Sequence, residues 1–122
     1  MKRVLLVDDD AAVLMSTGMG LKKMGYTVYT CKDAVNAISA VRKNNPDVVV
    51  IDISLPAGDG FSVAERVRRL DGSAATPVIF ITGSADSGLR ERAKKMGAVG
   101  FLKKPFDATQ LADAVEALAC LA

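Results

Sequence analysis

Short apolar runs alternate with longer amphipathic segments along the chain. The apolar runs are four or five residues long and predict β-strands over Arg3–Val7, Thr27–Cys31, Val48–Ile51, Val78–Ile81 and Val99–Leu102. The segments between and after them carry apolar residues at helical spacing and predict helices over Ala11–Met24, Asp33–Lys43, Phe61–Leu70, Asp86–Met96 and Asp107–Leu121. Five strand–helix units in succession predict an α/β fold, in which helices cover both faces of a parallel sheet.

The tetrapeptide KKMG ends two of the predicted helices, at Lys22–Gly25 and at Lys94–Gly97. Lysines in the last turn complement the negative end of the helix dipole, and a glycine just past the end can take the left-handed conformation. Each copy directly precedes an apolar run. We therefore interpret the two copies as shared helix-ending chemistry and not as an internal repeat.

The length and charge of the chain narrow its class. A chain of 122 residues predicts one domain, over residues 1–122. The net charge of +2 is too small to indicate direct binding of nucleic acid or acidic lipid, and the basic residues Arg90, Arg92, Lys94 and Lys95 are interpreted as a solvated helix face. No apolar stretch matches a signal peptide or a membrane span. We expect a cytoplasmic protein with no membrane partner.

The cysteines and the chain ends give little information about function. Cys31 and Cys120 show no metal-binding spacing, so both are interpreted as small core or surface residues in a reducing compartment. Met1 stands close before the first predicted strand, which favours a natural N-terminus. The C-terminus gives no such indication, and a DNA-binding domain could follow it.

The chain contains no histidine. This absence excludes Ser/His/Asp and Cys/His nucleophile systems, zinc sites that use histidine, and a phosphohistidine within the chain. Any chemistry must therefore depend on carboxylates, hydroxyls and amines.

Polar residues follow the predicted strands at one edge of the sheet. Asp8 and Asp9 follow the first strand, Asp52 the third, Thr82 the fourth and Lys104 the fifth. Ligands of open parallel α/β sheets bind outside the carboxyl ends of the strands. The sequence therefore predicts three carboxylates, a hydroxyl and an amine along one functional edge.

Crowded carboxylates need compensation, because two of them about 4 Å apart repel by roughly 4 kcal/mol at an effective dielectric near 20. Asp10 is accounted for as the cap of the helix that begins at Ala11. For the remaining aspartates, Mg²⁺ is the cation that a cluster of carboxylate oxygens selects. A carboxylate beside such a cation can act as a nucleophile toward a phosphoryl group.

Four motifs give the chain its resemblance to a known family. They are LLVDDD, DISLPAGDG, ITGS and FLKKPF, and they occur in the order and at the spacing of the receiver domains of two-component response regulators, which include single-domain chemotaxis regulators. The resemblance covers the whole chain. It implies a flavodoxin-like, doubly wound (βα)5 fold with the strand order 2-1-3-4-5.

The resemblance also implies roles for the acidic residues. Asp52 is expected to be the phosphoacceptor. Asp8 and Asp9 are the acidic pair expected to hold Mg²⁺ (or Mn²⁺) together with Asp52, and the backbone carbonyl of Ser54 is a further expected ligand. Lys104 is expected to pair with the phosphoryl oxygens.

A second implication concerns signalling. Thr82 and Phe101 match the switch pair of the family, in which the hydroxyl moves to the phosphoryl group and the aromatic ring turns inward. The implied function is a phosphorylation-dependent switch, and not an enzyme in its biological role, that takes its phosphoryl group from a sensor histidine kinase or a histidine phosphotransfer protein. An output partner or, on phosphorylation, a second protomer is expected on the face formed by the fourth helix, fifth strand and fifth helix.

Local chemistry offers simpler roles for some of these residues. Asp52 alone would be read as a strand-end aspartate in an Asx turn, and Asp59 as a loop and cap residue. Lys104 is selected over Lys103 by its position before Pro105. Most X-Pro bonds in folded proteins are trans, so residue type alone predicts a trans Lys104–Pro105 bond. The resemblance implies instead that this bond is cis.

Two other classes of protein share parts of the pattern. A haloacid dehalogenase-type phosphatase would use Asp8 as nucleophile and Asp10 as acid/base, but Ala12 stands where that motif has Thr or Val, and the chain has no room for a cap domain. A flavin-binding module of similar topology would need hydroxyls and free N–H groups for the FMN phosphate, and the first predicted loop is instead acidic.

Overall fold

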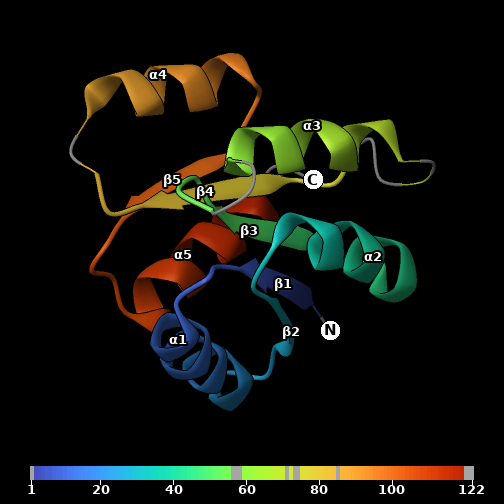
Figure 1. Ribbon diagram of the computed structural model, residues 1–122. Helices are drawn as coiled ribbons and strands as arrows, with labels where there is room; N and C mark the ends of the chain where they lie inside the picture. Colours follow the sequence, from blue (N-terminus) through green and yellow to red (C-terminus); the bar gives the residue numbers. More distant parts are fainter. Residues whose placement is uncertain (1, 56–58, 71, 73–74, 85, 120–122) are drawn as a thin grey trace.

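The computed structural model describes residues 2–55, 59–70, 72, 75–84 and 86–119. Strands and helices alternate strictly along the chain. They are β1 (Arg3–Val7), α1 (Ala11–Lys23), β2 (Thr27–Cys31), α2 (Ala34–Asn44), β3 (Val48–Asp52), α3 (Gly60–Arg69), β4 (Val78–Thr82), α4 (Ser87–Lys95), β5 (Gly100–Lys103) and α5 (Ala108–Ala119). All strand pairs are parallel, and the sheet order is β2-β1-β3-β4-β5, which confirms the predicted flavodoxin-like topology (Figure 1).

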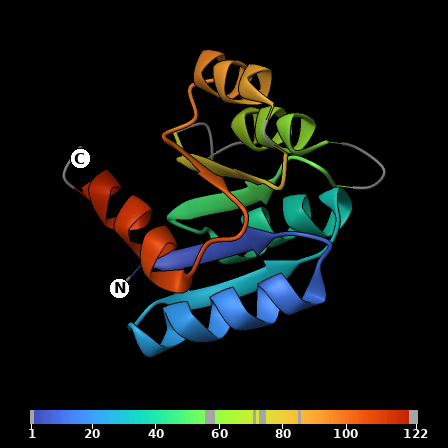
Figure 2. The ribbon, with the colours of Figure 1, turned by 90° about the vertical axis from the view of Figure 1, so that its left-hand side faces the viewer.

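The sheet separates two hydrophobic clusters. Successive residues of a strand point to opposite faces, so Val49 belongs to the cluster under α2, α3 and α4, whereas Val50 belongs to the cluster under α1 and α5. Figure 2 shows α1 and α5 on one side of the sheet and α3 and α4 on the other. Every residue of β3 and β4 is buried, as expected for central strands covered on both faces.

Aspartates directly precede most of the helices and cap their N-termini. Asp10, Asp33, Asp59 and Asp86 are the N-caps of α1 to α4, and each side chain accepts a hydrogen bond from a backbone N–H of the first turn. At α5, Asp107 and Gln110 exchange backbone-to-side-chain hydrogen bonds of 2.9 and 2.8 Å. The cap roles predicted for Asp10 and Asp59 are confirmed. Asp33, Asp86 and Asp107, predicted as first helical residues, instead precede their helices as caps.

The other predicted boundaries hold to within one residue where the structure describes them. β5 begins at Gly100 and not at Val99, and the predicted end of the last helix at Leu121 lies outside the described residues, as does Cys120. Gly25 and Gly97 have φ values of 96° and 79°, which confirms the left-handed role of the glycine in each KKMG. Among the described helices, none is long and apolar enough to cross a membrane.

Candidate functional site

The parallel sheet brings the predicted polar residues to its carboxyl edge. Asp52 and Thr82 are the last residues of the adjacent strands β3 and β4, while Asp8 and Lys104 directly follow β1 and β5. Asp8, Asp52 and Thr82 are 1%, 3% and 0% exposed. Three of the four side chains are therefore buried at the ends of mostly buried strands, and Lys104 reaches the site from the end of the partly exposed strand β5.

Lys104 forms ion pairs with two of the carboxylates. Its Nζ lies 2.7 Å from Asp8 Oδ2 and 2.9 Å from Asp52 Oδ2. Lys103 is exposed, so the selection of Lys104 is consistent with the geometry, and the Lys104–Pro105 bond is cis as predicted. The backbone N–H of Lys104 also donates to the Thr82 carbonyl at 2.7 Å, which ties the loop to the end of β4.

The second oxygen of each buried carboxylate accepts a local backbone hydrogen bond. Asp8 Oδ1 accepts from the N–H of Asp10, and Asp52 Oδ1 accepts from the N–H of Ser54, each at 2.9 Å. The Asx-type turn that local chemistry suggested for Asp52 is therefore present. It uses one oxygen, and the other faces the lysine.

The acidic residues have the arrangement that a divalent cation needs. One carboxylate oxygen from each of Asp8, Asp9 and Asp52 lies within 4.8 Å of the others. Asp8 Oδ2 is buried, and apart from its ion pair with Lys104 it has no donor in hydrogen-bonding geometry. Hard oxygen donors with an unsatisfied buried lone pair suit a divalent metal ion. The cluster is consistent with a divalent metal site of the kind that receiver domains have.

Burial and charge shift two pKa values in the site. Burial raises the pKa of Asp8, the nearby Lys104 and the Asp10 N–H oppose this, and the Asp52 charge adds to it. Burial alone would lower the pKa of Lys104, but its contacts with Asp8 and Asp52 outweigh burial and raise it. The lysine therefore stays charged and partly compensates the crowded carboxylates.

Thr82 and Phe101 lie in different surroundings. Thr82 Oγ1 is buried at the acidic edge and accepts a hydrogen bond of 3.0 Å from the Ser84 N–H. The Phe101 ring is half-buried and packs against the cluster under α2, α3 and α4. The guanidinium of Arg90 covers this ring at 4.9 Å from its centroid.

The basic face of α4 was only partly predicted. Arg90, Arg92, Lys94 and Lys95 are exposed, as expected of a solvated face, but Arg92 also lies 4.3 Å from the centroid of the Phe61 ring. Two of the four cations therefore cover aromatic rings, as cations commonly do. The sequence carries no local signal for these contacts, because the ring and the arginine come from different elements.

Comparisons with known proteins agree with this geometry. The family model described as "Response regulator receiver domain" matches residues 4–116. Transcriptional regulatory protein PrrA of Mycobacterium tuberculosis is 38% identical over 116 residues, which are 95% of this chain and 49% of PrrA. Sporulation initiation phosphotransferase F of Bacillus subtilis is 28% identical over 115 residues, which are 94% of this chain and 91% of that protein.

A solved structure shows the same likeness. Chemotaxis response regulator CheY4 of Vibrio cholerae superposes with a TM-score of 0.87 at 29% identity, over 95% of this chain and 97% of CheY4. The chain spans about half the length of PrrA and of the other transcriptional regulators that it matches. Neither the phosphatase nor the flavin-binding alternative receives support from these matches. The chain belongs to the response regulator receiver domain family, whose members are phosphoacceptor signalling modules served by a kinase or phosphotransfer partner.

Proposed function

We propose that Asp52 is the residue that receives the phosphoryl group, in a reaction that depends on Mg²⁺ (or Mn²⁺). The observation that carries this proposal is the pairing of Asp52 Oδ2 with Lys104 Nζ at 2.9 Å, beside the carboxylates of Asp8 and Asp9. A carboxylate oxygen of Asp52 forms the new O–P bond as the P–N bond to the donor's phosphohistidine breaks, and the histidine nitrogen keeps the electron pair of that bond. The donor leaves as neutral imidazole if its other ring nitrogen already carries a proton, and otherwise the leaving nitrogen takes a proton from water.

The other residues of the edge serve this transfer. Asp8, Asp9, Asp52 and the Ser54 carbonyl would hold the cation. When bound, the cation supplies positive charge to the phosphoryl oxygens. Lys104 supplies a second, fixed positive charge, and it is already within hydrogen-bond distance of Asp52.

The signal would leave the site through Thr82 and Phe101. Thr82 Oγ1 already accepts a hydrogen bond from Ser84, so its one O–H hydrogen is available to a phosphoryl oxygen. Movement of this hydroxyl would free space for the Phe101 ring, which is half-buried on β5 next to α4. The face formed by α4, β5 and α5 would then bind an output partner or a second protomer.

The first test is the intact mass of the protein after incubation with Mg²⁺ and a small acyl phosphate. We expect one phosphoryl adduct that requires the metal and is lost in Asp52→Asn. Asp10→Asn is the matched control, because Asp10 is a neighbouring aspartate whose side chain caps α1, and asparagine can keep that cap.

Peptide mapping of the adduct separates the proposal from its rival. Phosphate on Asp52 supports its assignment as the phosphoacceptor. Phosphate on Asp8 would contradict it and favour the phosphatase mechanism. Absence of any adduct, together with no binding of Mg²⁺ in a calorimetric titration, would show that this receiver is regulated without phosphate.

A further inference from the structure

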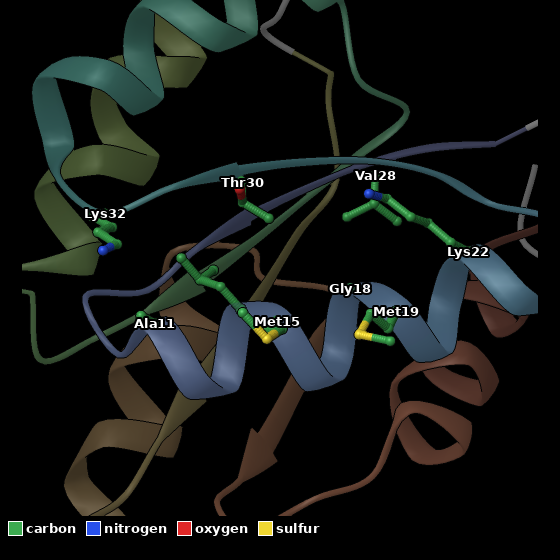
Figure 3. A pocket seen from close by; sticks show the side chains of 9 residues that line it. Ala11, Met15, Gly18, Met19, Lys22, Val28, Thr30 and Lys32 are labelled. Carbon is green, nitrogen blue, oxygen red and sulfur yellow. The ribbon is translucent and has the colours of Figure 1, made fainter.

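A surface groove of about 310 Å³ lies between α1 and the edge strand β2 (Figure 3). Met15 and Met19 line it from α1, Val28 and Thr30 line it from β2, and Gly18 leaves space between the two walls. β2 pairs only with β1 among the described strands, so the groove lies at one border of the sheet. It is separate from the acidic cluster and from the α4, β5 and α5 face.

The methionines of this groove are unusually exposed for large apolar side chains. Met15 is 67% exposed and Met19 is 54% exposed. They stand four residues apart, so they share one face of α1, while Leu21 of the same helix is buried in the cluster shared with α5. Leu14 belongs to that cluster and also forms part of the groove lining. Helix α1 therefore has two apolar sides, of which the described residues cover only one. Burial of the second side by another molecule would be favourable.

The charged residues that line the groove are both lysines. Lys32 lies at the end of the groove near Ala11, and Lys22 lies at the other end, with Met15 and Met19 between them (Figure 3). No acidic residue is among the residues that line the groove. A segment that filled it would gain from acidic residues placed at both ends of an apolar stripe.

A second copy of this chain is a poor occupant. In a two-fold symmetric contact the same surface meets itself, so Lys22 and Lys32 of one copy would face lysines of the other. A small ligand is also a poor occupant, because the only side-chain hydroxyl in the lining belongs to the exposed Thr30, and buried polar groups that would orient a ligand are missing from the lining.

We propose that the groove between α1 and β2 binds an acidic amphipathic helix of a partner protein. The stretch of α1 from Ala11 to Lys22 is about 16 Å long, so the partner helix would contribute about three turns. Its apolar stripe would pack on Met15 and Met19, whose flexible side chains adapt to different partners. Glutamates or aspartates at its two ends would pair with Lys22 and Lys32.

The probe is a synthetic helical peptide of three turns, with a leucine stripe and glutamates at both ends. It is titrated into the isotope-labelled full chain and followed by NMR, with a second peptide in which lysines replace the glutamates. We expect shifts centred on Met15, Met19 and Val28 for the acidic peptide, and binding at least tenfold weaker for the basic one. The double variant Met15→Ser/Met19→Ser should bind the acidic peptide at least tenfold more weakly, as should Lys22→Glu/Lys32→Glu.

Matched controls are present on the same helix and its cap. Met24→Ser removes a methionine that is 46% exposed but does not line the groove, and Lys23→Glu reverses a neighbouring exposed charge. Both should change peptide affinity less than twofold. Phosphorylation of Asp52 by an acyl phosphate should be unchanged in all these variants, so a failure here is distinguishable from a failure of the proposed function.

Four outcomes would overturn the proposal. Absence of shifts with the acidic peptide at millimolar concentration would show that the groove does not take such a helix. Equal binding of both peptides would remove the role of the lysines. Shifts of Met15 and Met19 with vesicles of anionic lipid but not with the peptide, or on raising the protein concentration alone, would assign the face to a membrane or to self-association.

Discussion

Lys104 Nζ lies 2.9 Å from Asp52 Oδ2 and holds a carboxylate that is only 3% exposed. The same ammonium pairs with Asp8, so removal of the lysine leaves two buried carboxylates without their nearest positive charge. Breaking a buried ion pair costs up to about 3–5 kcal/mol, and less here because the Lys104 side chain is 21% exposed.

We therefore predict that Lys104→Met lowers the free energy of unfolding by about 1–3 kcal/mol in metal-free buffer. Mg²⁺ should restore part of this loss, because the cation would compensate the same carboxylates. Denaturant unfolding with and without Mg²⁺ measures both effects. Lys103→Met is the matched control and should change stability by less than about 0.5 kcal/mol, since Lys103 is exposed. Equal losses in the two variants would contradict the prediction.

Metal binding should itself stabilise the fold. At a concentration about ten times its Kd, a ligand that binds only the folded state adds about 1.4 kcal/mol to the free energy of unfolding. Asp9 is exposed and contributes one of the three clustered oxygens, so Asp9→Asn should lose most of this increment without a large change in the metal-free protein.

The increment is measured as the rise in the midpoint of thermal unfolding on addition of Mg²⁺, and a chelator should reverse it. Asp10→Asn should retain the increment, because Asp10 lies outside the cluster and caps α1. If Asp9→Asn and Asp10→Asn respond to Mg²⁺ alike, the clustered oxygens are not the binding site.

Two glycines inside α1 should respond in opposite directions to the same substitution. A Cβ at Gly18 would make an ordinary contact of 3.7 Å with Val28, whereas a Cβ at Gly20 would overlap the Cβ of Ala108 on α5. Gly18→Ala should stabilise the protein by about 0.5–1 kcal/mol through helix propensity.

Gly20→Ala should destabilise the protein by about 1–3 kcal/mol, because α1 and α5 must move apart. Both values come from denaturant unfolding of the single variants. Stabilisation by Gly20→Ala would show that the two helices are not held at this distance.

The dependence of the free energy of unfolding on pH above about 10 should be due in part to Tyr26. Burial, the hydrogen bond to the Glu116 carboxylate and the nearby negative charges of Glu116 and Asp113 together raise the pKa of Tyr26 to about 12, and burial is the largest cause. Above the ordinary value of 10.0 the unfolded chain loses the phenol proton first, so the free energy of unfolding should fall as the pH rises from about 10 to about 12.

Denaturant unfolding at a series of pH values in this window measures the fall. Tyr26→Phe has no phenol proton and should show a flatter profile than the natural chain. Glu116→Gln should keep part of the fall, because burial is the largest cause of the shift. The same slope in Tyr26→Phe and the natural chain would assign the fall to other groups.

The edge of the site was predictable because parallel strands end at a common edge. Once the apolar runs before Asp8, Asp52, Thr82 and Lys104 were identified as strands, their order in the sheet brought these side chains together. The first residues of the helices were predicted less exactly. An aspartate at the start of a helical pattern can be either the cap or the first helical residue, and the sequence does not distinguish the two.

Contacts between distant elements were not predictable from local patterns. Tyr26 and Glu116 are ninety positions apart, and Arg90 meets Phe101 only because α4 folds over β5. The exposure of Met15 and Met19 was not predictable either, because periodicity identifies apolar faces but does not say which face another element covers.

The two hydrophobic clusters share only the backbone of the sheet between them. Val49 and Val50 are neighbours in β3, yet their side chains belong to different packing units. Energetic effects of substitutions on one side should therefore add to those on the other with little coupling. Core substitutions can accordingly accumulate in the layer of α1 and α5 and in the layer of α2, α3 and α4 independently, while the strand ends keep the side chains of the carboxyl edge in place.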